Sequence, residues 1–182
     1  MARLNIPNSI EDAPQESRSP LEQVGKRLGF VPNLHRLIAV SPDALSGVMQ
    51  LQAALSRTMD ARTRDSVALA VSQANGCDYC LCAHSHAAAT FNGFSDEEIA
   101  LAREGKSSHP GRHAAAAFAR RIIETRGHVS DDDLQAVRCA GFNDRQIVEL
   151  VALSVQFLLT NFMNNAIQTP IDFPQAEEAK VA

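Results

Sequence analysis

The segment "DSVALAVSQANGCDYCLCAH", residues 65–84, joins an apolar helical pattern to three of the chain's four cysteines and one histidine. The pair Asn75–Gly76 inside it suits the left-handed backbone at a helix end. The pattern therefore predicts an antiparallel hairpin of helices over residues 61–74 and 77–91, turning at this pair. The reactive side chains would then lie directly after the turn.

The rest of the chain also reads as helices with short polar joints, and almost no alternating strand pattern appears. Ser19 with Pro20, and Ser41 with Pro42, are typical of helix starts. Ser95 with Glu98 three residues later is a further start signal. The expected helices are residues 19–29, 41–57, 60–74, 77–91, 95–105, 111–127, 130–141 and a long last one from Asp144 to about Gln168. We predict an all-α helical bundle in one domain, residues 19–173.

The two chain ends differ from this helical body. Residues 1–18 are polar and contain Pro7 and Pro14, so we predict an extended arm that is ordered only where it lies on the body. Residues 174–182 are predicted to form a flexible tail.

An internal similarity relates two parts of the chain. At an offset of 84 positions, Asp65 falls on Glu149, and Val67, Ala68, Leu69 and Val71 fall on identical residues. The same offset sets Cys77 against Asn161 and Cys80 against Asn164. Either two helical hairpins of similar build pack together, the second as scaffold, or two Ala/Val/Leu-rich helices are alike by chance.

Composition limits the classes of function. The 182 residues are 45% hydrophobic and 21% charged, as expected for one soluble domain. The net charge is −4 without a basic block, and one Tyr with no Trp gives little for nucleic acid to stack on. No signal-peptide pattern and no apolar stretch of about 20 residues is found, so neither secretion nor a membrane span is expected. We predict a cytoplasmic protein, where a close cysteine pair is more often catalytic, redox-active or metal-binding than a structural disulfide.

Cys77, Cys80 and His84 share one face of the second predicted helix. At about 100° per residue, Cys80 lies about 60° and His84 about 20° from the direction of Cys77, whereas Cys82 points away. The first helical turn favours a thiolate through its unpaired N–H groups and dipole. His84, one turn after Cys80, can act on it as a base or stabilise its thiolate as an imidazolium. Cys80 is therefore the cysteine to be activated, and Cys77 is its partner in a short-loop disulfide.

Asp65 is the candidate third member of this group. In the expected hairpin residue 65 lies opposite residue 86, which brings Asp65 closer to His84 than to either sulfur. A carboxylate there would orient the imidazole and raise its basicity. The alternative is a solvated acid in the first turn of a helix.

Asp65-x11-Cys77-x2-Cys80-x3-His84 resembles the Glu-x11-Cys-x2-Cys-x3-His signature of alkylhydroperoxidase D-like proteins of the carboxymuconolactone decarboxylase family. "LGFVPNL", "GFSDEEI" and "NFMNNAIQTP" extend the resemblance to that family's peroxidase-related branch, over about residues 21–173. Two positions depart from the pattern: Asp65 replaces the family's Glu, and Tyr79 stands where some members have His. The phenol of Tyr79 can donate a hydrogen bond to peroxide or thiolate, and His86 is a further auxiliary candidate.

The resemblance implies an all-helical thiol peroxidase that assembles as a homotrimer or homohexamer. Cys80 would attack a small peroxide and Cys77 would close the disulfide, while His84 and Asp65 relay the proton. No cofactor is implied beyond the redox-active Cys77–Cys80 disulfide, which a lipoyl-type or other dithiol donor would reduce.

Other uses of the cluster remain open. Zinc could bind Cys77, Cys80 and His84 with Cys82 or His86, although a single helix closes a tetrahedron poorly. The thiols could also fill a core seam, or oxidise once in a redox sensor that does not cycle. Lactone decarboxylation, the chemistry of the family's name, does not call for two neighbouring thiols.

Residues outside the cluster receive structural roles. We expect Cys139 to be a buried free thiol and His35 to cap a helix or line an interface. The amide run Asn161, Asn164 and Asn165 is expected at a bundle or subunit interface, because buried amides need partners.

Overall fold

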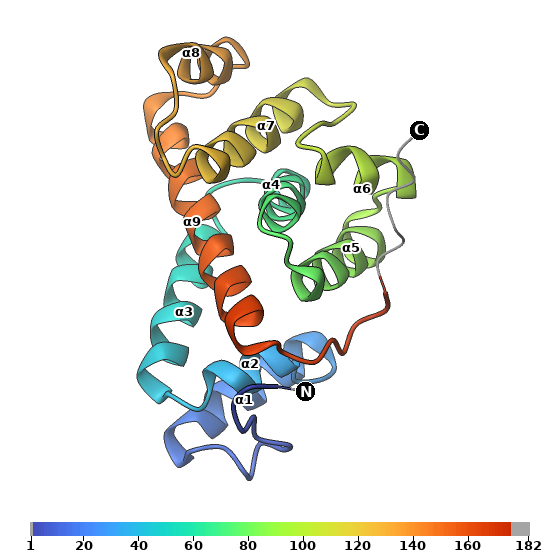
Figure 1. Ribbon diagram of the computed structural model, residues 1–182, viewed down its shortest axis with the longest axis vertical. Helices are drawn as coiled ribbons and strands as arrows, with labels where there is room; N and C mark the ends of the chain where they lie inside the picture. Colours follow the sequence, from blue (N-terminus) through green and yellow to red (C-terminus); the bar gives the residue numbers. More distant parts are fainter. Residues whose placement is uncertain (1, 176–182) are drawn as a thin grey trace.

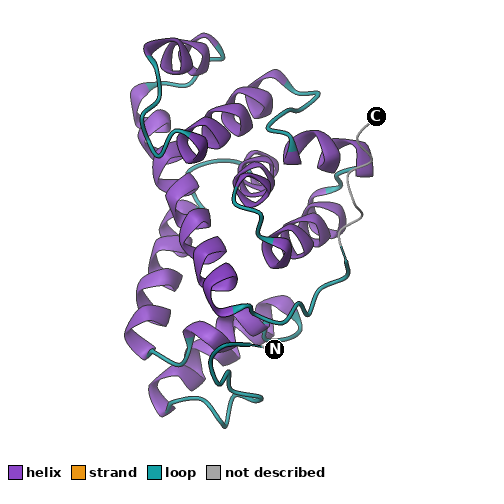
Figure 2. Ribbon diagram, in the orientation of Figure 1, coloured by secondary structure: helices purple, strands orange, loops and turns teal. Residues whose placement is uncertain are grey.

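The computed structural model describes residues 2–175, and within that range it contains nine α-helices and no strand (Figures 1 and 2). The prediction of an all-α protein is confirmed. The helices are α1 Gln15–Leu28, α2 Asn33–Ile38, α3 Pro42–Leu55, α4 Ala61–Ala74, α5 Asp78–Asn92, α6 Asp96–Arg103, α7 Pro110–Glu124, α8 Asp131–Cys139 and α9 Asp144–Ile167. The flexible tail predicted for residues 174–182 lies outside the described residues from position 176 onward.

Most helices begin where the capping signals place them. The side chains of Ser41 and Ser95 accept hydrogen bonds from backbone N–H groups three residues later. Ser130 and Asn143 form complete capping boxes at α8 and α9. Each cap satisfies a donor that the first helical turn leaves without a partner. No such side-chain cap precedes α2, which was not predicted.

Helix α1 corrects the predicted start at Ser19 and Pro20. It begins at Gln15, and Pro20 lies inside it. The residues before the expected start are held by burial, since Ala13 and Ser17 are buried and the Ser17 hydroxyl donates to the Ala39 carbonyl at 2.8 Å. Further along the arm, the Arg3 N–H donates to the Ile167 carbonyl at 2.8 Å, so the arm is ordered against the end of α9.

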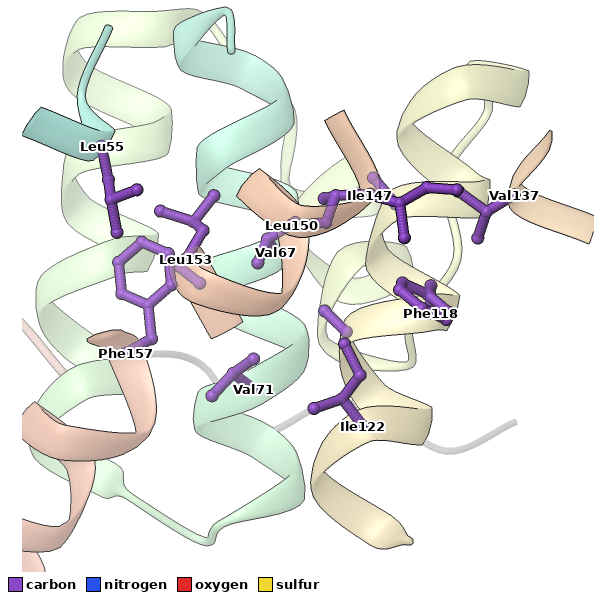
Figure 3. Packing of buried hydrophobic residues seen from close by; sticks show 13 residues of the cluster. Leu55, Val67, Val71, Phe118, Ile122, Val137, Ile147, Leu150, Leu153 and Phe157 are labelled. Atoms are coloured by element: carbon purple, nitrogen blue, oxygen red, sulfur yellow. The ribbon is translucent and has the colours of Figure 1, made fainter. Parts of the chain in front are cut away.

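Helix α4 is the centre of the bundle (Figure 1). It packs against α5, α6, α7 and α9, and its residues from Val67 to Val71 are fully buried. Figure 3 shows the largest apolar cluster, in which α4 meets α7 and α9. Its larger members are Leu55, Val67, Val71, Phe118, Ile122, Val137, Ile147, Leu150, Leu153 and Phe157.

The internal similarity falls on α4 and α9, but the second copy is not a hairpin. The first copy turns at Gly76, which has a φ of +56°. The residue at the matching position is Thr160, which lies within the uninterrupted helix α9. A threonine side chain disfavours the left-handed backbone that the glycine accepts, so α9 continues where α4 ends.

Helix α9 is, within residues 2–175, the one helix long and apolar enough to cross a membrane by length and composition alone. This differs from the expectation that the chain has no apolar stretch long enough for a membrane span. Its buried residues Ile147, Leu150 and Leu153 belong to the cluster around α4, and α9 also packs against α3 and α5. We therefore interpret it as the core helix of a soluble protein.

Replacing Leu150 by Ala tests the central packing. Leu150 is fully buried between α9 and α4, so we expect the free energy of unfolding to fall by about 2–5 kcal/mol in urea melts. Gln23→Ala, at an exposed position of α1, is the control and should change it by less than about 0.5 kcal/mol. Equal losses in the two variants would contradict this packing.

Candidate active site

Cys77 and Cys80 lie at the start of α5, where the hairpin turn ends. Cys77 is the N-cap residue, and Cys80 lies in the first helical turn. Both are reduced thiols and almost completely buried, with exposed fractions of 0% and 2%. The sulfur atoms therefore lie where the helix start favours negative charge, and with little access to solvent.

Hydrogen bonds make Cys80 the more acidic thiol. The Cys77 thiol bonded to Cys80 is the largest influence that lowers the pKa of Cys80, and it outweighs the opposing effect of burial. The Asn164 side chain donates to the Cys80 sulfur at 3.2 Å, and Asn161 and Thr160 add smaller effects in the same direction. The same bond to Cys80, followed by burial, raises the pKa of Cys77. The arrangement thus lets Cys80 lose its proton more readily than Cys77.

The amide run of α9 forms part of this site. Asn164 contacts Cys80, while Asn161 accepts from the Asn75 side chain at 3.0 Å and donates to Ser72 at 3.3 Å. Asn165 donates to the Asn75 carbonyl at 3.0 Å. Our expectation of a bundle interface is correct for these contacts, but the expectation that the second copy is only scaffold is wrong. Asn164, the residue matched to Cys80 by the internal similarity, is the one that binds it.

His84 lies one turn after Cys80 on α5, and both residues line the same cavity. Burial lowers the pKa of His84 to about 4, so the imidazole is neutral at neutral pH. Its ring packs edge-on against Phe157, with 5.1 Å between ring centroids. Of the two roles expected from the sequence, the neutral imidazole favours the base over the imidazolium.

Asp65 does not reach His84, contrary to the register expected from the sequence. Its carboxylate accepts a hydrogen bond from the Asn92 side chain at 2.5 Å, at the far end of the hairpin from the cysteines. At 1.5 Å per residue, Asp65 lies about 15 Å before Asn75 along α4, whereas His84 lies only about 10 Å beyond Cys77 along α5. Burial raises the pKa of Asp65 to about 6, against the opposing effect of the Asn92 bond.

A cavity of about 190 Å³ opens beside Cys80. It is predominantly apolar, and both auxiliary candidates, Tyr79 and His86, line it. His35 also lines it, which the sequence did not reveal, and burial lowers the pKa of His35 to about 4. The remaining lining residues are Leu28, Phe30, Pro32, Leu34, Gln52, Ala83, Ala87, Phe91, Gln156, Phe157, Thr160 and Phe173, besides Cys80 and His84.

The Tyr79 phenol bonds to residues 170–173, which we call the C-terminal segment. Its O–H donates to the Asp172 carboxylate at 2.8 Å and accepts from the Leu34 N–H at 3.1 Å. After α9 the C-terminal segment runs beside α2 and past the start of α5 (Figure 1). The phenol therefore fixes the C-terminal segment by hydrogen bonds, rather than donating a hydrogen bond to peroxide or to the Cys80 thiolate as expected from the sequence.

Two further expectations concern the other cysteines. Cys139, predicted to be buried, is exposed at the end of α8. Cys82 is buried on α5, and it does not line the cavity beside Cys80. Within residues 2–175 no group of three or more His, Cys, Asp or Glu side chains is placed to hold a metal ion, so the zinc alternative gains no support.

Comparisons with known proteins agree with this fold. Residues 42–124 match the model of the Carboxymuconolactone decarboxylase family. No curated protein sequence matches the chain significantly. Together with the solved structures described next, the family match supports the classification expected from the sequence, an alkylhydroperoxidase D-like protein of the carboxymuconolactone decarboxylase family.

Three solved structures illustrate the likeness. An uncharacterized peroxidase-related protein of Ralstonia eutropha JMP134, described as an alkylhydroperoxidase AhpD core, is 25% identical with a TM-score of 0.82, covering 94% of this chain and 92% of that one. A peroxidase-related protein of Silicibacter sp. TM1040 is 22% identical with a TM-score of 0.82, covering 98% and 96%. The debrominase Bmp8 in complex with 2,3,4-tribromopyrrole is 21% identical with a TM-score of 0.77, covering 94% of each chain.

Removal of the Asn164 amide tests the stabilisation of the Cys80 thiolate. In Asn164→Ala the sulfur loses a buried donor, so alkylation of Cys80 by iodoacetamide at pH 7 should slow about tenfold and recover at higher pH. Asn165→Ala, whose amide binds the Asn75 carbonyl instead, is the matched control and should leave the alkylation profile unchanged. A profile unaltered in Asn164→Ala would disprove the contact.

Replacement of Asp65 by Asn tests the environment of that carboxyl group. The folded protein binds the Asp65 proton up to about pH 6, whereas the ordinary pKa is 3.8, so ionisation costs stability as the pH rises from 4 to 6. The variant lacks this cost, so its free energy of unfolding should exceed that of wild type by about 1–2 kcal/mol at pH 7, but not at pH 4. Urea melts across this range measure the difference. A gain that is the same at both pH values would refute the assigned burial.

Proposed function

We propose that the protein is a thiol-dependent hydroperoxide reductase with Cys80 as nucleophile and Cys77 as resolving cysteine. The observation that carries this proposal is the Cys80 sulfur, which accepts hydrogen bonds from Cys77 and Asn164 at the wall of an otherwise apolar cavity. Thiol reactivity follows the thiolate form and access to the reagent. The hydrogen bonds favour the thiolate, and the cavity provides a route for a small reagent.

In the first step the Cys80 thiolate attacks the outer oxygen of the hydroperoxide. The O–O bond breaks, Cys80 becomes a sulfenic acid, and the released alkoxide takes up one proton to leave as the alcohol. His84, neutral and on the same cavity wall, passes this proton from solvent. Asp65 takes no direct part, because its carboxylate lies against Asn92.

In the second step the Cys77 sulfur attacks the Cys80 sulfenic acid. The S–O bond breaks, the Cys77 proton leaves with the hydroxyl group as water, and the disulfide forms. A small dithiol, such as a lipoyl-type group, then exchanges with this disulfide and is itself oxidised to a disulfide. The sum is one hydroperoxide and one dithiol converted to one alcohol, one water and one oxidised donor.

The same thiols could instead remove bromide from an aromatic ring. The aromatic side chains around the cavity favour this second candidate, and a protein of similar fold is a debrominase. The Cys80 thiolate would take bromine from the ring, which gains a proton, and Cys77 would displace bromide to form the disulfide. The external dithiol would again supply the two electrons.

Assembly and location remain proposals drawn from the family resemblance. We propose a homotrimer or homohexamer in the cytoplasm. Exposed apolar side chains along one helix, α9, support assembly, because large exposed apolar faces mark contact surfaces. They are Val148, Val151, Val155, Leu159 and Phe162.

Peroxide consumption with an excess of dithiol tests the function. Wild type should consume many peroxides per subunit, whereas Cys80→Ser should fall to the rate measured without protein. Without dithiol, Cys77→Ser should consume about one peroxide per subunit and accumulate a sulfenic acid on Cys80 that dimedone traps. Cys139→Ser, at the exposed cysteine, is the matched control and should retain wild-type turnover.

The number of turnovers decides between an enzyme and a sensor. If wild type consumes only about one peroxide per subunit and then remains oxidised under dithiol, the protein is a redox sensor that does not cycle. Peroxide turnover that is absent while bromide is released from a brominated pyrrole would instead establish the second candidate.

A further inference from the structure

The cavity beside Cys80 is lined by uncharged types of side chain. Among the described residues that line it, none is Asp, Glu, Lys or Arg. The polar side chains are those of Gln52, Gln156, Thr160 and the histidines, and the rest of the wall is aliphatic or aromatic. A ligand that enters this space leaves water for an apolar wall, and a charged ligand group would lose its hydration without a partner.

The local charges also disfavour an anion. The pKa values of His35 and His84 are lowered to about 4 by burial, so at neutral pH neither carries a positive charge that could pair with a carboxylate. At the Cys80 sulfur, the hydrogen bonds from Cys77 and Asn164 favour a negative charge. An anionic ligand would therefore meet repulsion as well as desolvation.

The size of the cavity suits one ring. Its volume is about 190 Å³. A closed apolar cavity of about 150 Å³ in another protein binds benzene. Aromatic side chains from four parts of the chain stand around the space. They are Phe30 before α2, Tyr79 and Phe91 on α5, Phe157 on α9, and Phe173 in the C-terminal segment. Such rings favour edge-to-face packing with an aromatic ligand.

Phe173 completes the cavity from the C-terminal segment. Its ring centroid lies 5.4 Å from that of Phe30 and 5.7 Å from that of Tyr79, both edge-on. Asp172 fixes the segment by accepting from the Asn33 N–H at 2.7 Å and from Tyr79 at 2.8 Å. The Asn33 side chain adds a bond to the Pro170 carbonyl at 2.9 Å. These bonds hold Phe173 as a fixed wall against the cavity.

We propose that this cavity binds a neutral molecule carrying a single aromatic ring, and that Phe173 is a specificity-determining residue for it. The fate of the ligand rests on the proposed function, because Cys80 must act on it. The binding of the ligand does not rest on that function, since the shape, polarity and charge of the cavity wall determine binding before any reaction.

Two matched alcohols test the proposal by calorimetry on the reduced full-length protein. The neutral probe is 2-phenyl-2-propanol, and the anionic probe is 2-hydroxy-2-phenylpropanoate, in which a carboxylate replaces one methyl group. We expect saturable binding of the neutral probe and at least about tenfold weaker binding of the anion. Phe173→Ala should lower the affinity for the neutral probe about fivefold or more. Ile171→Ala, an apolar truncation in the same segment outside this cavity, should bind as wild type does.

Three results would overturn the proposal. They are no saturable binding of the neutral probe, equal or tighter binding of the anion, or an equal loss of affinity for the neutral probe in Phe173→Ala and Ile171→Ala. The probe comparison needs only wild type, so a variant that fails to fold does not remove the test. Neither probe can be reduced by a thiol, so binding does not depend on turnover. Selective binding without peroxide turnover would refute the proposed function alone, and hydrogen peroxide turnover without ring binding would refute this inference alone.

Discussion

The enclosure of the middle of α4, residues 66–72, is the constraint on which the rest of the structure depends. Small side chains at Ala68 and Ala70 let its neighbours approach closely, and every residue of this stretch is buried. The chain leaves α4 through the left-handed turn at Gly76, so α5 starts directly beside α4, with Asp78 exposed and with Cys77 and Cys80 on the inner side. The two cysteines at this start are buried as a result.

A sulfur anion placed there needs donors in place of water, and α9 supplies them. Because α9 runs unbroken past the point where α4 turns, its amide side chains stand opposite the start of α5. The two related segments thus differ in backbone and in chemistry at once. One supplies the thiols, with the Cys77 bond as the main cause of the lowered pKa of Cys80, and the other supplies an amide that lowers this pKa further. In a low-dielectric interior each such bond is stronger than it would be in water.

The sequence predicted local features well and distant contacts poorly. Caps such as Ser95 and Ser130 mark helix starts because the partner of the cap lies three residues away. Spacing likewise placed Cys80 and His84 on one face of a helix. It could not give the distance between helices, and so Asp65 was assigned to His84 although it binds Asn92. Asn164, His35 and Asp172 reach the site from other parts of the chain, and no periodicity encodes such a meeting.

The burial of both sulfur atoms has a consequence for which thiols can react with them. Thiol–disulfide exchange requires the attacking sulfur to touch its target in line with the bond that breaks. With exposed fractions of 0% and 2%, Cys77 and Cys80 are out of reach of the convex surface of a folded thiol protein. Only a reagent slender enough to enter the cavity can equilibrate with the pair. A disulfide formed between Cys77 and Cys80 would therefore be kinetically insulated from bulky thiols, whatever the potential of those thiols.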